Sequence, residues 1–132
     1  MNRRPRADAT DAELAVLKIL WDRGPSTIRL LTDLLYPAGG AAQYATVQKL
    51  LERLEGKACV RRRSERRVNV YSAAIELDDL IGHRLRETAE KLCQGSLTPL
   101  LTHLAGASEL SSDDLDALRD LIGRLDDENA EG

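Results

Sequence analysis

The stretch that most constrains the fold is residues 43–71, in which a helical pattern of apolar residues gives way to a strand pattern after Lys57. In its first part, the apolar residues recur at spacings of three and four and therefore share one face of a helix: Val47, Leu50, Leu51 and Leu54. Its second part predicts two short strands joined by a turn at Ser64 and Glu65. This hairpin carries five arginines within seven residues: Arg61, Arg62, Arg63, Arg66 and Arg67. An amphipathic helix followed by a basic hairpin is typical of a surface that binds nucleic acid.

The core has to be built almost without aromatic side chains. The 132 residues include no phenylalanine, one tryptophan and three tyrosines, although 42% of the chain is hydrophobic. Leucine, isoleucine, valine and alanine must therefore fill the interior, which favours helices packed on helices. A chain of this length makes one domain or two small ones. We predict a mainly α-helical protein with one small β-hairpin.

Charge is divided unevenly between the two halves of the chain. Residues 1–72 carry 14 Lys and Arg against 8 Asp and Glu, a net charge of +6, whereas residues 73–132 carry 5 against 14, a net charge of −9. A polyanion such as DNA attracts the first half and repels the second. The overall net charge of −3 conceals this division, and we expect the two halves to have different tasks.

Start and stop signals for helices divide the first half into three helical segments. The first helix begins at a capping box, in which Thr10 accepts a hydrogen bond from the backbone and Glu13 reaches back, and it stops at residues 24–25. Either Ser26 or Thr27 caps the second helix, which ends before the third begins. Together with the basic hairpin, these helices predict a winged helix-turn-helix domain over residues 10–74.

The third helix, which begins near residue 43, has the position of a recognition helix in such a domain. Base-edge contacts are expected from its exposed face: Gln43, Ala45, Thr46, Gln48 and Lys49. Phosphate or minor-groove contacts are expected around it and on the wing: Tyr44, Arg53, Lys57, Arg63, Arg66 and Arg67. Thr46 suits a thymine methyl group and Lys49 suits a guanine edge. For Tyr44, a phosphate bond and packing under the wing both remain open, whereas for Tyr71 we expect packing.

Stripes of leucine and isoleucine dominate residues 75–125, where three further helices are predicted. The stripes contain Leu77, Leu80, Ile81, Leu85, Leu92, Leu97, Leu100, Leu101, Leu104, Leu115, Leu118, Leu121, Ile122 and Leu125. A piece of this size without aromatic residues has too little bulk to close a core alone, and a second copy of the chain is the simplest partner. Residues 75–125 are therefore predicted to form a helical dimerisation domain.

Residues 1–9 are expected to form a flexible arm, either along DNA or frayed in solvent, and residues 126–132 a disordered acidic tail.

No constellation for catalysis or metal binding is visible in the sequence. His83 and His103 are the only histidines, and together with Cys93 they lack the spacing of a helical pair of metal ligands, so neither a metal nor another cofactor is expected. No apolar run reaches the roughly 18 residues that a membrane span needs, and no apolar signal core follows the N-terminus. We therefore predict a cytoplasmic protein that is not an enzyme and does not insert into a membrane.

Several short motifs follow one another along the chain. They are Thr10-Asp11-Ala12-Glu13-Leu14, Val16-Leu17, Leu20-Trp21, Gly24-Pro25, Tyr44-Ala45-Thr46-Val47, Leu50-Leu51, Arg53-Leu54, Lys57, residues 67–72, Gly95-Ser96, Leu110-Ser111 and residues 118–121. In this order and spacing, they resemble the BlaI/MecI/CopY family of penicillinase repressors over nearly the whole chain. Ala58 and Arg66 stand where that family commonly has glycines, and Ala73 where it usually has proline. The paired C-terminal cysteines of the copper-responsive members are absent.

The resemblance implies a homodimeric transcriptional repressor that occupies a palindromic operator in double-stranded DNA until an inducing signal releases it. In penicillinase repressors, this signal is cleavage in the C-terminal domain, caused by a membrane sensor protease. The corresponding bond here joins His103 and Leu104, without the usual asparagine and phenylalanine. A winged-helix adaptor whose hairpin binds an acidic protein or RNA is the alternative from another class. The two functions differ in whether the exposed face of residues 43–53 is needed for binding.

Overall fold

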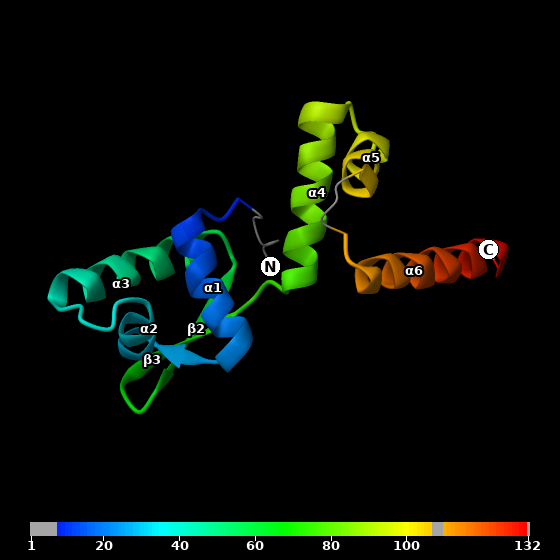
Figure 1. The fold of residues 1–132 in the computed structure, drawn as a ribbon. Helices are drawn as coiled ribbons and strands as arrows, with labels where there is room; N and C mark the ends of the chain where they lie inside the picture. Colours follow the sequence, from blue (N-terminus) through cyan, green and yellow to red (C-terminus); the bar gives the residue numbers. More distant parts are fainter. Residues whose placement is uncertain (1–7, 107–109, 132) are drawn as a thin grey trace. The chain divides into compact units, whose positions relative to one another are not determined.

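The computed structural model describes residues 8–106 and 110–131, and this described part contains six helices and three strands (Figure 1). The chain divides into two compact units, residues 1–85 and residues 86–132. The first unit contains α1 (Asp11–Arg23), β1 (Ser26–Thr27), α2 (Ile28–Leu35), α3 (Ala41–Gly56), β2 (Val60–Glu65) and β3 (Val68–Ala73). Helix α4 (Leu77–Cys93) begins in the first unit and continues into the second, which also contains α5 (Thr98–Gly106) and α6 (Ser112–Glu131). The arm predicted for residues 1–9 lies almost entirely outside the described residues.

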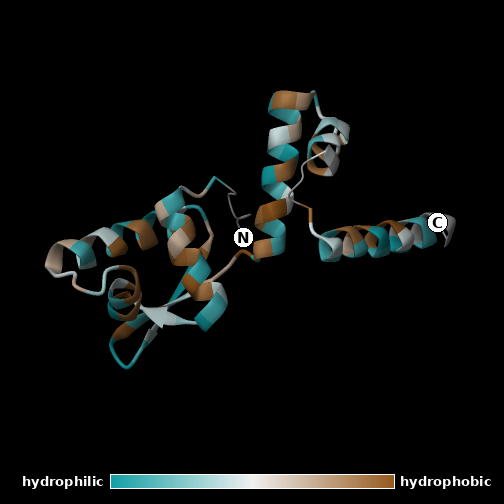
Figure 2. Ribbon diagram, viewed as in Figure 1, coloured by the Kyte–Doolittle hydropathy of each residue, from teal (hydrophilic) through white to brown (hydrophobic). Residues whose placement is uncertain are grey.

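Three helices and a small antiparallel sheet enclose the core of the first unit. The sheet has the order β1-β3-β2. Its fully buried apolar side chains come from all three helices and from the start of the hairpin: Val16, Leu17, Leu31, Val47, Leu51, Leu54 and Cys59. Figure 2 shows hydrophobic and hydrophilic bands alternating along α3, as the predicted amphipathic pattern requires. The mainly α-helical winged helix-turn-helix fold is confirmed, although β1, with only two residues, gave no sequence pattern and was not predicted.

The beginning of α4 packs on this core. The indole nitrogen Nε1 of Trp21 donates to the backbone oxygen of Ile75 at 2.8 Å, and an Arg84 guanidinium nitrogen donates to the backbone oxygen of Ala9. Leu80 is only 4% exposed and belongs to the same core cluster. Its assignment to the dimerisation stripe is therefore wrong, because its side chain is already buried within the first unit.

Two side chains cap the first helices. Thr10 Oγ1 accepts from the backbone nitrogen of Glu13 at 3.2 Å, which confirms half of the predicted capping box. The Glu13 carboxylate does not complete the box, because its Oε2 atom lies 2.7 Å from Lys57 Nζ. At the second helix, Thr27 Oγ1 accepts from Leu30 N at 3.1 Å, so Thr27 rather than Ser26 is the cap.

The turn of the hairpin lies two residues beyond the predicted one. Strands β2 and β3 pair with Glu65 opposite Val68, which leaves Arg66 and Arg67 as a two-residue loop. Their φ angles are 52° and 67°, as a type I′ turn requires. A turn at residues 64–65 would have placed Arg63 opposite Arg66, and like charges directly across a ladder are destabilising. The observed register places Val70 opposite Arg63 instead.

The second unit has little buried apolar surface of its own. Ala89 is the one buried hydrophobic side chain among its described residues. At the start of α6, Ser111 Oγ accepts from Asp114 N at 3.0 Å and Asp114 Oδ2 accepts from Ser111 N at 3.2 Å, so the two residues form a capping box. The disordered tail predicted from residue 126 is wrong, because α6 continues to Glu131. Neither glycine nor proline interrupts it after Gly123.

Candidate nucleic-acid interface

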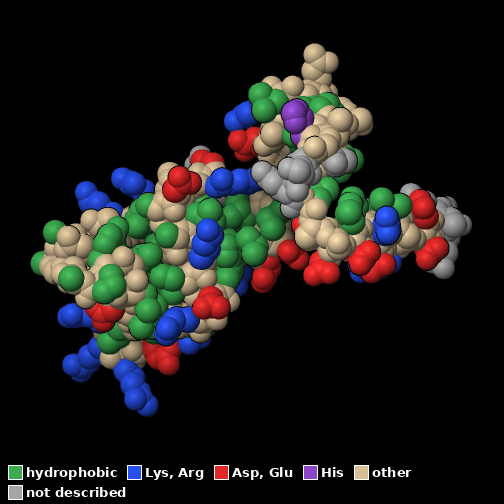
Figure 3. Space-filling view, in the orientation of Figure 1, with side chains coloured by type: hydrophobic (Ala, Val, Ile, Leu, Met, Phe, Trp, Pro, Cys, Tyr) green, Lys and Arg blue, Asp and Glu red, His purple; other side chains and the backbone are tan. Residues whose placement is uncertain are grey.

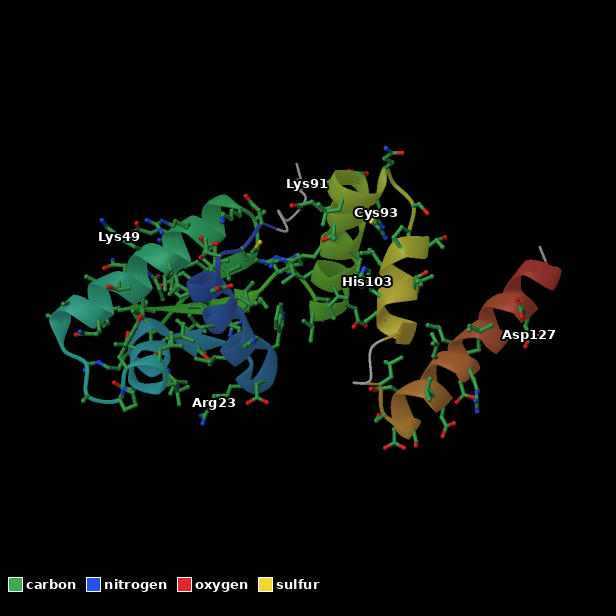
Figure 4. The ribbon with its side chains drawn as sticks, turned by 45° about the horizontal axis from the view of Figure 1, so that its top comes forward. Arg23, Lys49, Lys91, Cys93, His103 and Asp127 are labelled. Atoms are coloured by element: carbon green, nitrogen blue, oxygen red, sulfur yellow. The ribbon has the colours of Figure 1, made fainter. Side chains whose placement is uncertain are left out.

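The outer face of α3 is polar and open to solvent. Its inner face is fixed in the core by Val47, Leu50, Leu51 and Leu54. On the opposite side, Ala45, Gln48 and Lys49 are exposed, and Figure 4 shows Lys49 pointing away from the rest of the first unit. Within the described part of the chain, neither Gln48 nor Lys49 has a hydrogen-bond or ion-pair partner. An amide and a cation of this kind suit the major-groove edges of adenine and guanine.

Two other predicted base-contacting residues already have partners inside the protein. Gln43 Oε1 accepts from Gly40 N at 2.8 Å and so closes the first turn of α3, leaving its amide nitrogen for a ligand. Thr46 Oγ1 donates to Ala42 O at 3.0 Å, a bond that leaves its methyl group available for a thymine methyl. The outer face of α3 therefore offers one cation, two amide groups and two small apolar groups.

A hollow of about 360 Å³ lies beside the start of α3. It is lined by Arg29, Thr32, Asp33, Gly39, Gly40, Ala41 and Tyr44. Tyr44 is 38% exposed. It is therefore not packed under the wing, and its hydroxyl can reach a ligand. Arg29 was not among the predicted contacts, and only its exposed position at the start of the second helix could have suggested it.

The arginines of the hairpin fall into two groups by their neighbours. Arg62 Nε lies 3.4 Å from Glu55 Oε2, and Arg63 Nη2 lies 2.9 Å from Glu65 Oε2. For Arg61, Arg66 and Arg67, the structure of residues 8–106 and 110–131 gives no ion pair. Figure 3 shows blue side chains projecting from the end of the hairpin. The turn therefore carries the positive charge that is least neutralised by the protein itself.

Lys57 was predicted to contact phosphate, and the structure gives it another role. Its Nζ atom lies 2.7 Å from Glu13 Oε2 and donates to Asp8 O at 3.2 Å. The two side chains of the pair are only 16% and 1% exposed. A phosphate contact would leave the Glu13 carboxylate buried and unpaired, which is strongly unfavourable, so we remove Lys57 from the predicted contacts.

Tyr71 is part of the core, as expected, with 5% exposure. Burial raises the pKa of its hydroxyl above the ordinary value, and the neighbouring Arg62 charge opposes this shift only in part. The hydroxyl therefore stays protonated, and the ring packs beneath the hairpin, where it holds β3 against the helices.

The second unit exposes most of its large apolar side chains. Eight of them are between 39% and 78% exposed: Leu92, Leu97, Leu101, Leu104, Leu115, Leu118, Leu121 and Ile122. On the part of α4 that belongs to the first unit, Leu77, Ile81 and Leu85 are also about half exposed. Leu100 is intermediate, and the side chain of Leu125 lies outside the described residues.

The described part of the chain was also searched for metal-binding clusters and for helices that could cross a membrane. No group of three or more His, Cys, Asp and Glu residues could hold a metal ion there, and His83, Cys93 and His103 do not form one. The described helices include none with the length and apolar character that a membrane crossing needs.

One of the comparisons with known proteins identifies a family. The sequence profile of a family described as penicillinase repressor matches residues 9–124. Among solved structures, the chain is similar to the DNA-binding domain of the repressor BlaI, with 27% identity and a TM-score of 0.47. That similarity covers 60% of this chain and 93% of the other. No curated protein matches the chain significantly.

Proposed function

Because the chain belongs to the penicillinase repressor family, we propose that it represses transcription as a homodimer bound to a palindromic operator in double-stranded DNA. Members of this family are DNA-binding transcriptional repressors, a class of protein that is generally not enzymatic. The dimer, the operator and the release by an inducing signal are our proposal.

The observation that carries this function is the outer face of α3. A helix with a buried inner face and an unpartnered Lys49 and Gln48 on its outer face can enter a major groove without losing any internal bond. The proposed base contacts are Gln43, Ala45, Thr46, Gln48 and Lys49. Proposed backbone or groove contacts are Tyr44, Arg53, Arg63, Arg66 and Arg67, to which the structure adds Arg29. Backbone contacts position the protein but do not specify the sequence.

The exposed leucines of the second unit support the dimer. A piece of fewer than 50 residues with one buried apolar side chain in its described part is marginal as a folded unit. Large apolar side chains that are exposed on three successive helices are typical of an interaction surface. A second copy supplies the same leucines in a two-fold arrangement and brings two α3 helices to one DNA duplex. Half-sites are then expected about 34 Å, or a multiple of that, apart.

Release is proposed to act through the second unit. The bond between His103 and Leu104 lies in α5, and Leu104 is 55% exposed. A protease needs extended backbone, so α5 would first have to open locally. The membrane sensor protease of the family is the partner we propose for this step. Cutting there would separate the dimer contacts of α6 from the DNA-binding unit and weaken the avidity of two linked half-sites.

A gel-shift titration with the DNA upstream of the gene, in the presence of random duplex competitor, tests the function. Lys49→Ala is expected to weaken binding to the upstream DNA about tenfold and to leave binding to random DNA nearly unchanged, since a base contact is lost. Lys18→Ala, an exposed lysine of α1, is the matched control. Equal losses on both DNAs for Lys49→Ala would remove α3 from base contact. Binding that depends on the hairpin but not on α3 would favour the adaptor for RNA or an acidic protein.

A further inference from the structure

Besides the predicted base contacts, the outer face of α3 carries one acid, Glu52, which is exposed to solvent. Successive residues of a helix are rotated by about 100°, so Ala45, Lys49 and Glu52 all lie within about 40° of the direction opposite the buried stripe. Glu52 is therefore nearer to the centre of this face than Gln48 is. A groove that receives Lys49 also receives this carboxylate.

No internal contact explains an acid at this position. Within residues 8–106 and 110–131, the Glu52 side chain has neither a hydrogen bond nor an ion pair, although Lys49 precedes it at the spacing of a helical ion pair. Glu55, at the edge of the outer face, is different. It is partly buried, and its Oε2 atom lies 3.4 Å from Arg62 Nε. The protein thus neutralises the acid at the edge of the face and leaves the central acid charged and open.

An open carboxylate on this face opposes DNA binding unless the DNA offers it a partner. Phosphates line both edges of the major groove and repel a negative charge. The base edges do offer partners, because a carboxylate only accepts hydrogen bonds and the amino groups of cytosine and adenine donate them. In an A·T pair, the adenine amino group lies between two acceptors, adenine N7 and thymine O4, which repel a carboxylate. The cytosine amino group has an acceptor, guanine O6, on one side only, so cytosine is the better partner.

We propose that Glu52 is a specificity-determining residue of the operator site, and that its carboxylate accepts a hydrogen bond from the N4 amino group of a cytosine. This inference rests on the proposed DNA-binding function. Glu52 is offset from Lys49 by about 4.5 Å along the helix axis, at about 1.5 Å per residue. Base pairs are stacked about 3.4 Å apart. This offset lets Lys49 contact a guanine and Glu52 a cytosine in neighbouring base pairs.

The test compares the duplexes that the full-length wild type and its variants select from a random pool. The wild type is expected to select cytosine at one fixed position of each half-site, and to bind duplexes with another base there about tenfold more weakly. Glu52→Gln should move this preference from cytosine to adenine, because an amide can accept from the N6 amino group while it donates to N7. Glu52→Ala should accept every base at this position and keep the rest of the half-site.

Two controls separate base contact from general effects of charge and folding. Asp22→Ala removes the same charge from an exposed position of α1 and should keep the cytosine preference. Glu52→Gln should have the same midpoint of thermal unfolding as the wild type, because Glu52 has no internal partner to lose among the described residues.

Two results would overturn the inference. Tighter binding of Glu52→Ala to every duplex by one common factor, with unchanged base preferences, would show that the carboxylate only repels DNA. A Glu52→Gln variant that selects the same bases as the wild type would exclude a contact with a base edge. Either result leaves the proposed repressor function intact, since the wild type still selects a sequence. If the wild type selects no sequence, the proposed function fails and the inference fails with it.

Discussion

The two units use the same amino acid in opposite ways. In the first unit, Leu51 and Leu54 are completely buried, whereas in the second unit Leu118 and Leu121 remain 39% and 47% exposed. All four lie on helices with the same spacing of apolar residues. The periodicity therefore identifies an apolar face but does not tell what covers it. The helices and strands of the first unit bury its own leucines. We propose that a second copy of the chain buries the leucines of the second unit.

Truncation of a buried leucine is expected to produce the largest effect and to affect the first unit alone. Leu54→Ala should lower the free energy of unfolding by about 3 kcal/mol, because the site is fully enclosed and collapses poorly. Leu121→Ala, the same change on α6, should leave the unfolding of the first unit almost unchanged. Trp21, the only tryptophan, packs against the first core and reports its unfolding in urea by fluorescence. Equal losses for the two variants would contradict the division between the units.

Polar substitution in the second unit should change the assembly rather than the fold of the first. Leu118→Ser with Leu121→Ser is expected to convert the dimer to a monomer and to weaken binding to a palindromic duplex about 100-fold, since the avidity of two linked half-sites is lost. Binding to a single half-site should not change. Sedimentation velocity and gel shift measure the two effects, and Arg119→Ser, an exposed polar position of the same helix, is the control. A wild-type protein that sediments as a monomer would refute the proposed dimer.

The two units also differ in what an ion pair of nearly the same length contributes. Lys57 and Glu13 lie 2.7 Å apart and are mostly buried, whereas Lys91 and Glu87 lie 2.8 Å apart and are 71% and 49% exposed. Glu87 raises the pKa of Lys91 by a hydrogen bond and by its charge, but water screens this exposed pair. The distance between the charges is therefore a poor guide to their effect on stability.

Substitution of each lysine by methionine tests this difference. Lys57→Met should lower the free energy of unfolding by about 2 kcal/mol, because it leaves the Glu13 carboxylate buried without its partner. Lys91→Met should cause no measurable change. Adding Glu13→Gln to Lys57→Met should recover most of the loss, since the unpaired charge is then removed. A double variant as unstable as Lys57→Met in urea unfolding would show that the loss comes from packing of the lysine stem instead.

Much of the first unit could be predicted because its local signals agree with its packing. The stripe from Val47 to Leu54 faces the core as its spacing indicates, and Thr27 caps α2 as one of two candidates. The errors concern choices that depend on partners distant in the sequence. The role of Lys57 depends on Glu13, 44 residues earlier, and the burial of Leu80 depends on a core formed by earlier helices. Likewise, the position of the hairpin turn depends on which side chains face each other across the strands.

The smallest effect is expected from the strained residue that follows α3. Ala58 has a φ of 61°, in the left-handed region, where backbone bonds from Ala58 N to Glu55 O and from Cys59 N to Leu54 O close the end of the helix. Ala58→Gly should raise the free energy of unfolding by about 0.5 kcal/mol, because the relief of strain exceeds the added freedom of the unfolded chain. Ala45→Gly, in the helical part of α3, should lower it by about 1 kcal/mol. A loss for both variants in urea unfolding would mean that the residue after α3 is not strained, and that the family's common glycine at this position serves another purpose.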